Sequence, residues 1–458
     1  MKRNKGYTRF GSIVLILSIL LLSLSLVSCS PFSFGLISLG DGTPSETSGQ
    51  TVNTTPGGSL ANPSGGGAGS SNSSGSGNSS GSSGGTNVTI IGDGTDNVAV
   101  AVAQGLRSAV SIYCTFEKTV LGGSFWNPQP TTQTYYTTGS GVLYTLDADG
   151  SAFILTNHHV VYDAGSTTAN GVSDTIYVYL YGMENEAYAI PATFVGGSAN
   201  YDIAVLRVEK SAVLKNAYAS GSAAAVSIGD SDMVFPGMTT IAIGNPSATD
   251  LGGLSVTKGI VSVDSEYITM VASDNSGEVS FRVIRTDTPV NSGNSGGGLY
   301  SDKGELIGIV NAKITSSEIE SIGYAIPSNV ARAIADNIID YCYQKDCESV
   351  MRGLLGVTIT TTAYSTVYDT ESGMLVRSEE ISVHEVTAGG LAENILKAGD
   401  VVKSITIGER TVTVSRQHHL IDAMLDVRIG DKVSMVIVRG GTEMTVTTTI
   451  TEDCLAAY

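Results

Sequence analysis

The chain has 458 residues, a length that predicts more than one folded unit, because single hydrophobic cores stop growing at about 250–300 residues. It carries 25 basic and 43 acidic side chains, a net charge of −18, which argues against nucleic acids and anionic membrane surfaces as electrostatic partners. Charged residues make up only 15% of the chain, whereas Gly contributes 55 residues. This composition is more typical of a β-rich exported protein than of a helical cytosolic enzyme.

Residues 1–28 have the pattern of an export signal. A basic start, MKRNKGYTRF, precedes an uncharged apolar stretch of signal-peptide size. The stretch ends in LVSC, which resembles a bacterial lipobox, and this implies that Cys29 is lipid-modified after cleavage. The alternative is an uncleaved anchor, since about 18 apolar residues can just span a bilayer. Both predict an exported, membrane-tethered protein of the bacterial cell envelope.

Residues 29–96 are predicted to form a flexible linker. From about residue 41 onward the segment consists largely of Gly, Ser, Asn and Thr, with almost no large apolar side chains. Such a segment cannot bury enough surface to fold. Its mean span is about 40 Å for a Gly/Ser-rich chain, so we expect it to hold a folded head away from the membrane.

From about residue 97 to 326, short β-like runs alternate with turns rich in Gly, Asp and Asn. Examples are AFILTNHHVV, DIAVLRV, SFRVIRT and GELIGIVNAKI. Many short strands at this spacing indicate an all-β sandwich or a pair of barrels. A helix is predicted to follow in NVARAIADNIIDYCYQ, with Ser328 as its N-cap.

Polar residues with complementary chemistry end several of these runs. His158 and His159 close AFILTNHHVV, Asp202 begins DIAVLRV, and Ser295 lies in the Gly-rich NSGNSGGGL. A serine hydroxyl becomes a nucleophile when a His removes its proton, and that His needs a carboxylate to hold its tautomer. A Gly-rich turn lets backbone N–H groups converge on an oxyanion. The backbone N–H groups of Gly293 and Ser295 are therefore candidate oxyanion donors.

An esterase is the first alternative for this serine. The pentapeptide GNSGG also satisfies the G-x-S-x-G pattern of the esterase nucleophile elbow. That fold alternates strands with helices, and its catalytic His follows the Ser. Here helices are nearly absent before Ser295, and the histidines after Ser295 all lie in residues 347–458, outside the strand-rich region. We therefore reject this alternative.

The cysteines give no support for a metal site. No C-x-x-C pair and no Cys/His cluster with zinc spacing occurs, so the sequence predicts neither a metal nor another cofactor. Cys342 and Cys347 are close enough to form a disulfide in an exported protein. Cys342 also lies on the i+4 apolar stripe of the predicted helix, and the pairing stays open.

Three segments together carry a family resemblance. TNHHVV, DIAVLRV and TDTPVNSGNSGGGLYSDKGELIGI resemble the catalytic blocks of the HtrA/Deg family of trypsin-like serine proteases, and IAIGNPSA, SVTKGIVS and IGYAIPSN fit the same family. The resemblance implies a mainly β chain with a trypsin-like double Greek-key β-barrel protease domain over 97–346. It makes His159 the base, Asp202 its orienting carboxylate and Ser295 the nucleophile.

The chain departs from the family pattern at two positions. Gly298 stands where the family usually has Pro, and His158 stands where it usually has Asn. Neither change removes a catalytic group. Gly298 is expected to loosen the loop.

Residues 347–458 mix strands with two predicted short helices, in GGLAENILKAGD and RQHHLIDAMLDV, which indicates a small α+β module. RGLLGVTI followed by AGGLAENILKAGDVVKSI resembles the PDZ domain that follows the protease in this family. The resemblance implies that the loop of Leu354, Leu355, Gly356 and Val357 binds the carboxylate of a C-terminal peptide, which adds a strand to the sheet edge.

The combined prediction is a membrane-tethered serine endopeptidase that cleaves unfolded or damaged proteins and is regulated by C-terminal peptides at its PDZ domain. The family implies a homotrimer. The alternative from another class is a catalytically silent holdase chaperone or a PDZ peptide-binding scaffold. The intact set of His159, Asp202 and Ser295 disfavours that alternative.

Overall fold

The computed structural model describes residues 97–124, 127–246, 253–314, 322–343, 350–388 and 390–457. The predicted signal peptide, Cys29, the linker and Cys347 lie outside these residues. In the described part of the chain, no helix is long and apolar enough to cross a membrane.

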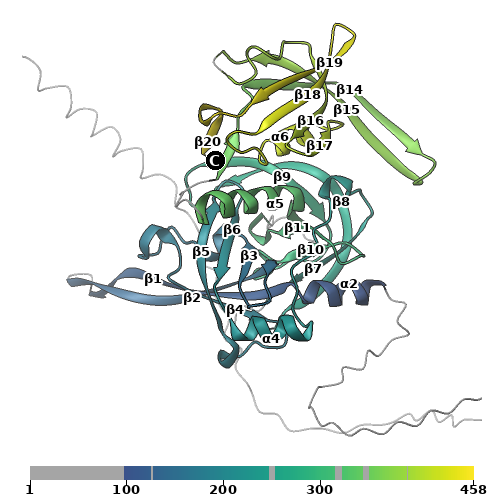
Figure 1. The fold of residues 1–458 in the computed structure, drawn as a ribbon. Helices are drawn as coiled ribbons and strands as arrows, with labels where there is room; N and C mark the ends of the chain where they lie inside the picture. Colours follow the sequence, from purple (N-terminus) through teal and green to yellow (C-terminus); the bar gives the residue numbers. More distant parts are fainter. Residues whose placement is uncertain are drawn as a thin grey trace, which may run out of the picture. The chain divides into compact units, whose positions relative to one another are not determined.

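The first six strands close into an antiparallel barrel (Figure 1). They are β1 (Ala109–Ser124), β2 (Asn127–Leu146), β3 (Ala152–Thr156), β4 (Thr175–Leu180), β5 (Ile190–Ser198) and β6 (Ile203–Val208). Their order is β1-β2-β3-β6-β5-β4, so β3 pairs with β6 instead of its neighbour in sequence, as in a Greek key. Alternate side chains of β1, such as Val110, Ile112 and Cys114, are buried in the barrel core.

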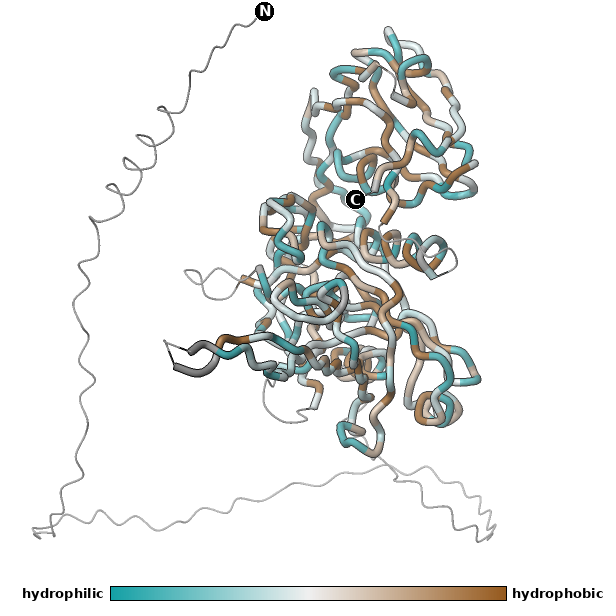
Figure 2. The backbone as a smooth tube through the Cα atoms, turned by 90° about the vertical axis from the view of Figure 1, so that its left-hand side faces the viewer, coloured by the Kyte–Doolittle hydropathy of each residue, from teal (hydrophilic) through white to brown (hydrophobic). Residues whose placement is uncertain are grey.

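The next six strands close a second antiparallel barrel, in the order β10-β11-β12-β9-β8-β7. They are β7 (Thr239–Gly244), β8 (Ser255–Val271), β9 (Glu278–Thr286), β10 (Gly298–Tyr300), β11 (Leu306–Val310) and β12 (Gly323–Pro327). Hydrophobic and hydrophilic residues follow one another along much of the described chain (Figure 2). The prediction of two β-barrels is confirmed.

Short helices connect and cover the barrels. The α-helices are α2 (Asn97–Leu106), α3 (His158–Val161), α4 (Ala212–Ser220) and α5 (Ser328–Asn337); the 3₁₀-helices are η1 (Ala169–Gly171), η2 (Glu186–Tyr188), η3 (Ser231–Met233) and η4 (Ala312–Ile314); the π-helix η5 (Ile338–Tyr343) continues α5. The N-cap prediction for α5 is wrong. Pro327 occupies the cap position, and the Ser328 hydroxyl donates instead to the Gly229 carbonyl over 2.7 Å.

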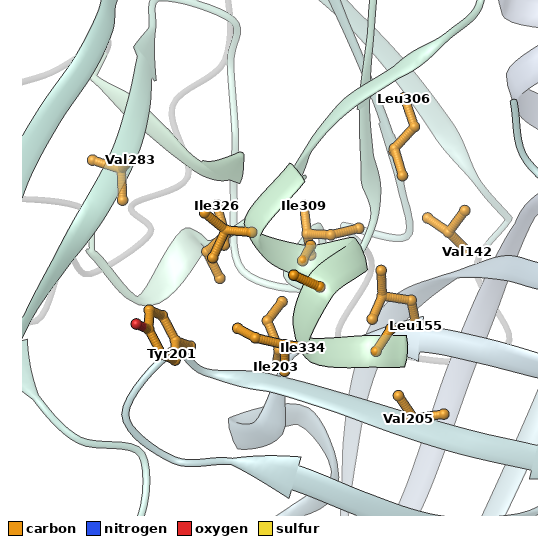
Figure 3. Packing of buried hydrophobic residues seen from close by; sticks show 14 of the residues in the cluster. Val142, Leu155, Tyr201, Ile203, Val205, Val283, Leu306, Ile309, Ile326 and Ile334 are labelled. Carbon is orange, nitrogen blue, oxygen red and sulfur yellow. The ribbon is translucent and has the colours of Figure 1, made fainter. Parts of the chain in front are cut away.

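Helix α5 contributes to a core that both barrels share. Its Ile334 lies among Ile309 and Ile326 of the second barrel and Leu155 and Val205 of the first (Figure 3). All five side chains are buried. This shared apolar cluster fixes the barrels against each other, so that loops from both can meet at one site.

The C-terminal module is an α+β unit, as predicted. Its strands are β13 (Met351–Gly353), β14 (Val357–Asp369), β15 (Met374–Val386), β16 (Val401–Ile407), β17 (Arg410–Thr413), β18 (Lys432–Arg439), β19 (Thr442–Thr449) and β20 (Leu455–Ala457); its helices are α6 (Gln417–Ala423) and the 3₁₀-helix η6 (Glu452–Cys454). The main sheet has the order β14-β15-β16-β18-β19, with β17 on β16, and β13 pairs with β20.

One predicted helix of this module is wrong. The segment from 390 to 400 forms successive turns instead of a regular helix. The Asp400 carboxylate, which is held by Arg439, accepts the backbone N–H of Lys397 over 2.8 Å. This side-chain acceptor competes with the helical hydrogen-bond pattern.

Candidate active site

His159 and Asp202 meet at the end of the first barrel. We predicted both histidines at a strand end, but they lie in the one-turn helix α3, directly after β3. The Nδ1 atom of His159 is 2.6 Å from Oδ2 of Asp202, and the backbone N–H of His159 donates to Oδ1 of Asp202 over 2.9 Å. Asp202 precedes β6 and has a positive φ of 54°. Through these two contacts, both carboxylate oxygens of Asp202 bind His159.

Two asparagines complete the surroundings of Asp202. The Nδ2 atom of Asn311, directly after β11, donates to Oδ2 of Asp202 over 2.8 Å, and the Nδ2 atom of Asn157 donates to the Asp202 carbonyl over 2.8 Å. Burial by itself would raise the pKa of Asp202, but the charge of His159 and its hydrogen bonds lower that pKa below the ordinary value. Asp202 is thus an ionised, fixed acceptor for the imidazole.

His158 has a different environment from its neighbour. Its ring is buried, stacks on Tyr162 at 4.7 Å between ring centroids, and places Nδ1 2.7 Å from the Ser273 hydroxyl. Burial lowers the pKa of His158 to about 4, so the ring is neutral near pH 7. The carboxylate of Asp202 is hydrogen-bonded to His159, the neighbour of this buried ring.

The Ser295 loop crosses from the second barrel to the first. The Ser295 carbonyl accepts the backbone N–H of Ser140 in β2 over 2.8 Å. The Ser140 hydroxyl donates to the Gly293 carbonyl over 2.7 Å and accepts the backbone N–H of Asn245 over 2.8 Å. The Ser295 hydroxyl itself accepts the backbone N–H of Ala312 over 3.2 Å. Its hydrogen bond is therefore with Ala312 and not with His159, and catalytic hydrogen bonds often tighten only when substrate binds.

Close backbone packing explains why this loop contains so many glycines. Gly293 has a φ of 94°, and a Cβ atom there would lie 2.1 Å from the Asn245 carbonyl oxygen. Gly296 has a φ of 82°, and its Cβ would lie 2.2 Å from the Ser140 carbonyl oxygen. Within the described residues, the backbone N–H groups of Gly293 and Ser295 donate to no protein acceptor. They are available to a ligand oxygen.

The predicted loosening at Gly298 is not what the structure shows. Gly298 is buried, begins β10 and pairs with Ile309 of β11 and Ile243 of β7. A Cβ atom at this position would lie 2.4 Å from the ring of Tyr300. The missing side chain makes room for that ring, so Gly298 belongs to a packed strand.

The predicted peptide loop of the C-terminal module lies between β13 and β14. The Leu354 backbone N–H donates to the Cys454 carbonyl over 2.8 Å, so this amide is already engaged. The carbonyls of Leu355 and Gly356 accept the backbone N–H groups of Ala392 and Thr387, which follow β15, and Gly356 has a φ of 70°. Val357 begins β14, against which α6 packs. The amides of Leu355 and Gly356 are the remaining candidates for binding a carboxylate.

Asn157 and Asn311 are the residues of this site that the sequence did not single out. Asn157 lies in TNHHVV, which carried the family resemblance, and Asn311 lies in the strand-like run GELIGIVNAKI, two residues beyond the third resembling segment. An isolated Asn in a strand-rich segment has no distinctive pattern. Their role depends on contacts across the fold, since β3 and β11 belong to different barrels.

The chain is similar in sequence to known trypsin-like serine proteases. Residues 139–309 match the trypsin-like peptidase domain family. Serine protease Do-like HtrA of Bacillus subtilis is 33% identical over 312 residues, which cover 67% of this chain and 62% of the relative. A probable periplasmic serine endoprotease, DegP-like, of Pseudomonas putida is 32% identical over 308 residues, which cover 66% of this chain and 54% of the relative. The solved structure of the HtrA-type protease AlgW with decapeptide is 28% identical, covers 77% of this chain and 98% of that chain, and has a TM-score of 0.46.

The barrels and the sequence match define a trypsin-like peptidase domain. The chain belongs to the HtrA/Do-like family of serine proteases, as the resemblance predicted. It spans less than two thirds of the length of these curated relatives, 62% and 54% respectively.

Proposed function

We propose that the chain is an exported serine endopeptidase that cleaves unfolded or damaged polypeptides. The observation that carries the proposal is the pair of His159 and Asp202, 2.6 Å apart, in a site to which the Ser295 loop is tied through Ser140. A serine next to such a pair is the arrangement that activates a hydroxyl for attack on a peptide carbonyl.

In the proposed mechanism, His159 takes the Ser295 proton as the hydroxyl oxygen attacks the scissile carbonyl carbon. Asp202 accepts from Nδ1 and stabilises the imidazolium that forms. The oxyanion accepts the backbone N–H groups of Gly293 and Ser295. His159 then donates the proton to the leaving amine, and water attacks the acyl-enzyme with His159 again as the base.

Casein digestion tests this proposal. Ser295→Ala, His159→Ala and the double variant should each lose about 10⁴-fold or more in kcat, without additivity, because the groups act as a unit. His158→Asn is the matched control and should keep most activity. If Ser295→Ala digests casein as well as the parent, the protease proposal is wrong. If that variant is inactive and the parent also fails, while both suppress aggregation, the holdase alternative is supported.

We further propose that the module of residues 347–458 is a PDZ domain that binds apolar C-terminal peptides and raises protease activity. The supporting features are the left-handed Gly356, the amides of Leu355 and Gly356, and the packing of α6 against β14. Gly356→Ala should weaken peptide affinity, because Ala is strained at a φ of 70°. Fluorescence anisotropy with a labelled peptide measures this, and equal affinity in both proteins would contradict it.

The cellular arrangement is likewise a proposal from the sequence and the family. We expect a homotrimer, which light scattering of the purified protein can test. We also expect lipid attachment at Cys29, held apart from the protease by the linker. In cells, Cys29→Ala should remain unprocessed and free of acyl chains, whereas a mature N-terminus elsewhere with unmodified Cys29 would contradict the lipid anchor.

A further inference from the structure

Asp232, His418 and His419 form a second cluster of polar side chains, separate from the active site. Asp232 lies in η3, the 3₁₀-helix before β7 of the second barrel, and the two histidines lie in the first turn of α6 in the C-terminal module. Each residue offers one potential ligand atom, and these atoms lie within 4.8 Å of one another. Asp232 and His419 also line a cavity of about 10 Å³. A space of that size suits a single ion or water.

Contacts of the two imidazoles leave a nitrogen of each able to coordinate a metal. The Nδ1 atom of His419 is 2.9 Å from the Thr413 carbonyl oxygen, which can only accept, and 3.4 Å from the Ser415 backbone nitrogen, which can only donate. The shorter contact favours the tautomer with the proton on Nδ1 and a lone pair on Nε2. The Nδ1 atom of His418 contacts the Ser265 hydroxyl at 3.4 Å, and its Nε2 is 3.8 Å from Oδ1 of Asp232. That last separation is too long for a hydrogen bond and leaves room for an ion between the atoms.

The carboxylate of Asp232 is held by two outer partners. Nη2 of Arg282 lies 3.1 Å from Oδ1, and Nδ2 of Asn329 donates to Oδ2 over 3.0 Å. Metal-ligating carboxylates and histidines normally have such outer hydrogen bonds, which orient them. Nη2 of Arg282 also lies 2.7 Å from Oδ2 of Asp422. One guanidinium is therefore shared between two carboxylates.

We propose that Asp232, His418 and His419 bind a divalent transition metal, with Zn²⁺ as the best match. Two imidazoles and one carboxylate are a donor set that suits Zn²⁺, and a water can complete the tetrahedron. In such a centre the ligand atoms lie roughly 3.3 Å apart. The cluster, open to 4.8 Å at most, must therefore contract by about 1.5 Å or less when the metal binds.

The site joins two parts of the chain that are distant in sequence. Its carboxylate comes from η3 and its imidazoles come from α6, so a bound metal stabilises the contact between α6 and the protease domain. This goes beyond the proposed protease activity. A bound metal would strengthen the attachment of the C-terminal module, since only the joined arrangement offers all three ligands.

Zn²⁺ binding to the metal-stripped full chain tests the proposal. In the Ser295→Ala background, which prevents self-digestion, competition with a chromophoric chelator should give one bound Zn²⁺ per chain. His418→Ala/His419→Ala should lose more than the 10–100-fold in affinity that is typical of outer-sphere changes. His384→Ala, an exposed histidine of β15, is the matched control and should bind like the parent. His159→Ala should also retain the ion, which excludes binding at the active site.

A second measurement covers the case in which the double variant does not fold. Asp232→Asn preserves side-chain shape but removes the carboxylate, so Zn²⁺ should raise the thermal unfolding temperature of the parent and not of this variant. Co²⁺ in place of Zn²⁺ should give the visible absorption of a tetrahedral site in the parent alone. The proposal is overturned if the parent takes up no Zn²⁺ at micromolar concentration, or if Asp232→Asn responds to Zn²⁺ as the parent does.

Discussion

His158 and His159 are adjacent in α3, yet burial and hydrogen bonding give them opposite properties. His159 is partly exposed and pairs with the carboxylate of Asp202, which suits its proposed role as the base. His158 is enclosed by Tyr162 and Ser273, which favours the neutral ring. A side chain of Gly197 would approach His158 within 2.6 Å, so this pocket has no spare room.

The His158 pocket predicts a pH dependence of stability. Burial is the main cause that lowers the pKa of His158 from 6.5 to about 4; Asp202 and Asp274 oppose it, and His159 and Lys313 add to it. Between these two values the unfolded chain binds more protons than the folded chain, so the free energy of unfolding falls as the pH falls. At about 1.4 kcal/mol per pKa unit, this residue should account for a loss of roughly 3 kcal/mol between pH 6.5 and pH 4.

Urea unfolding at several pH values measures this contribution. His158→Asn should unfold with a flatter pH profile than the parent over that window, by roughly 3 kcal/mol. His384→Asn, at an exposed position, should follow the parent profile. Parallel profiles for the parent and His158→Asn would show that the buried ring does not resist protonation.

The sequence could predict His159, Asp202 and Ser295 because each has a distinctive side chain inside a family-like segment. It could not predict Asn311, whose hydrogen bond to Asp202 exists only because β11 and β6 are brought together by the packed barrels. It also could not reveal the cluster of Asp232 with the α6 histidines, since spacing along the chain carries no information about that contact.

At the scale of elements, predictions of helix and strand ends failed where a local turn or hydrogen bond competed with the pattern in the sequence. The run AFILTNHHVV predicted a strand with the histidines at its end, but β3 ends at Thr156 and the chain turns into α3. The hydroxyl of Ser328 could have accepted a hydrogen bond as an N-cap, but it donates to the Gly229 carbonyl instead. Both strand-rich barrels were predictable, because alternating burial recurs in many segments and outweighs single local errors.

Strand β10 shows how one glycine can permit tight packing. The Tyr300 ring is fully buried, lies over Gly298 and places its hydroxyl 3.1 Å from that of Ser108. Gly298→Ala would introduce a Cβ 2.4 Å from the ring, and overpacking of this kind typically costs about 1–3 kcal/mol of unfolding free energy. We therefore expect Gly298→Ala to lower stability by an amount in this range.

A double-mutant cycle tests whether Tyr300 is the cause. Tyr300→Leu removes the ring atoms that the new methyl would meet, so Gly298→Ala should cost less in that background than in the parent. The difference is the coupling energy between the two positions. Equal costs in both backgrounds, measured by urea unfolding, would place the strain elsewhere in β10.

At the scale of the whole molecule, charged side chains connect the C-terminal module to the protease barrels. Arg332 of α5 donates to both carboxylate oxygens of Asp426 over 2.8 and 2.9 Å. Arg416, at the start of α6, donates to Asp264 of β8 over 2.8 Å. Helix α5 packs against β11, and Asn311 directly follows β11. A shift of the C-terminal module can therefore displace the residues around Asp202.

This arrangement predicts that the pair of Arg332 and Asp426 carries part of the response to peptides. A C-terminal peptide bound beside α6 should change kcat/KM in the parent, and allosteric couplings of this kind are typically about 5–150-fold. Arg332→Gln keeps length and polarity but loses the charge, and should reduce that response by roughly 2–30-fold. Lys403→Gln removes an exposed ion pair within the module and should respond like the parent. Peptide affinity measured by anisotropy should be similar in all three proteins, which separates coupling from binding. If Arg332→Gln responds as fully as Lys403→Gln does, the coupling does not pass through α5.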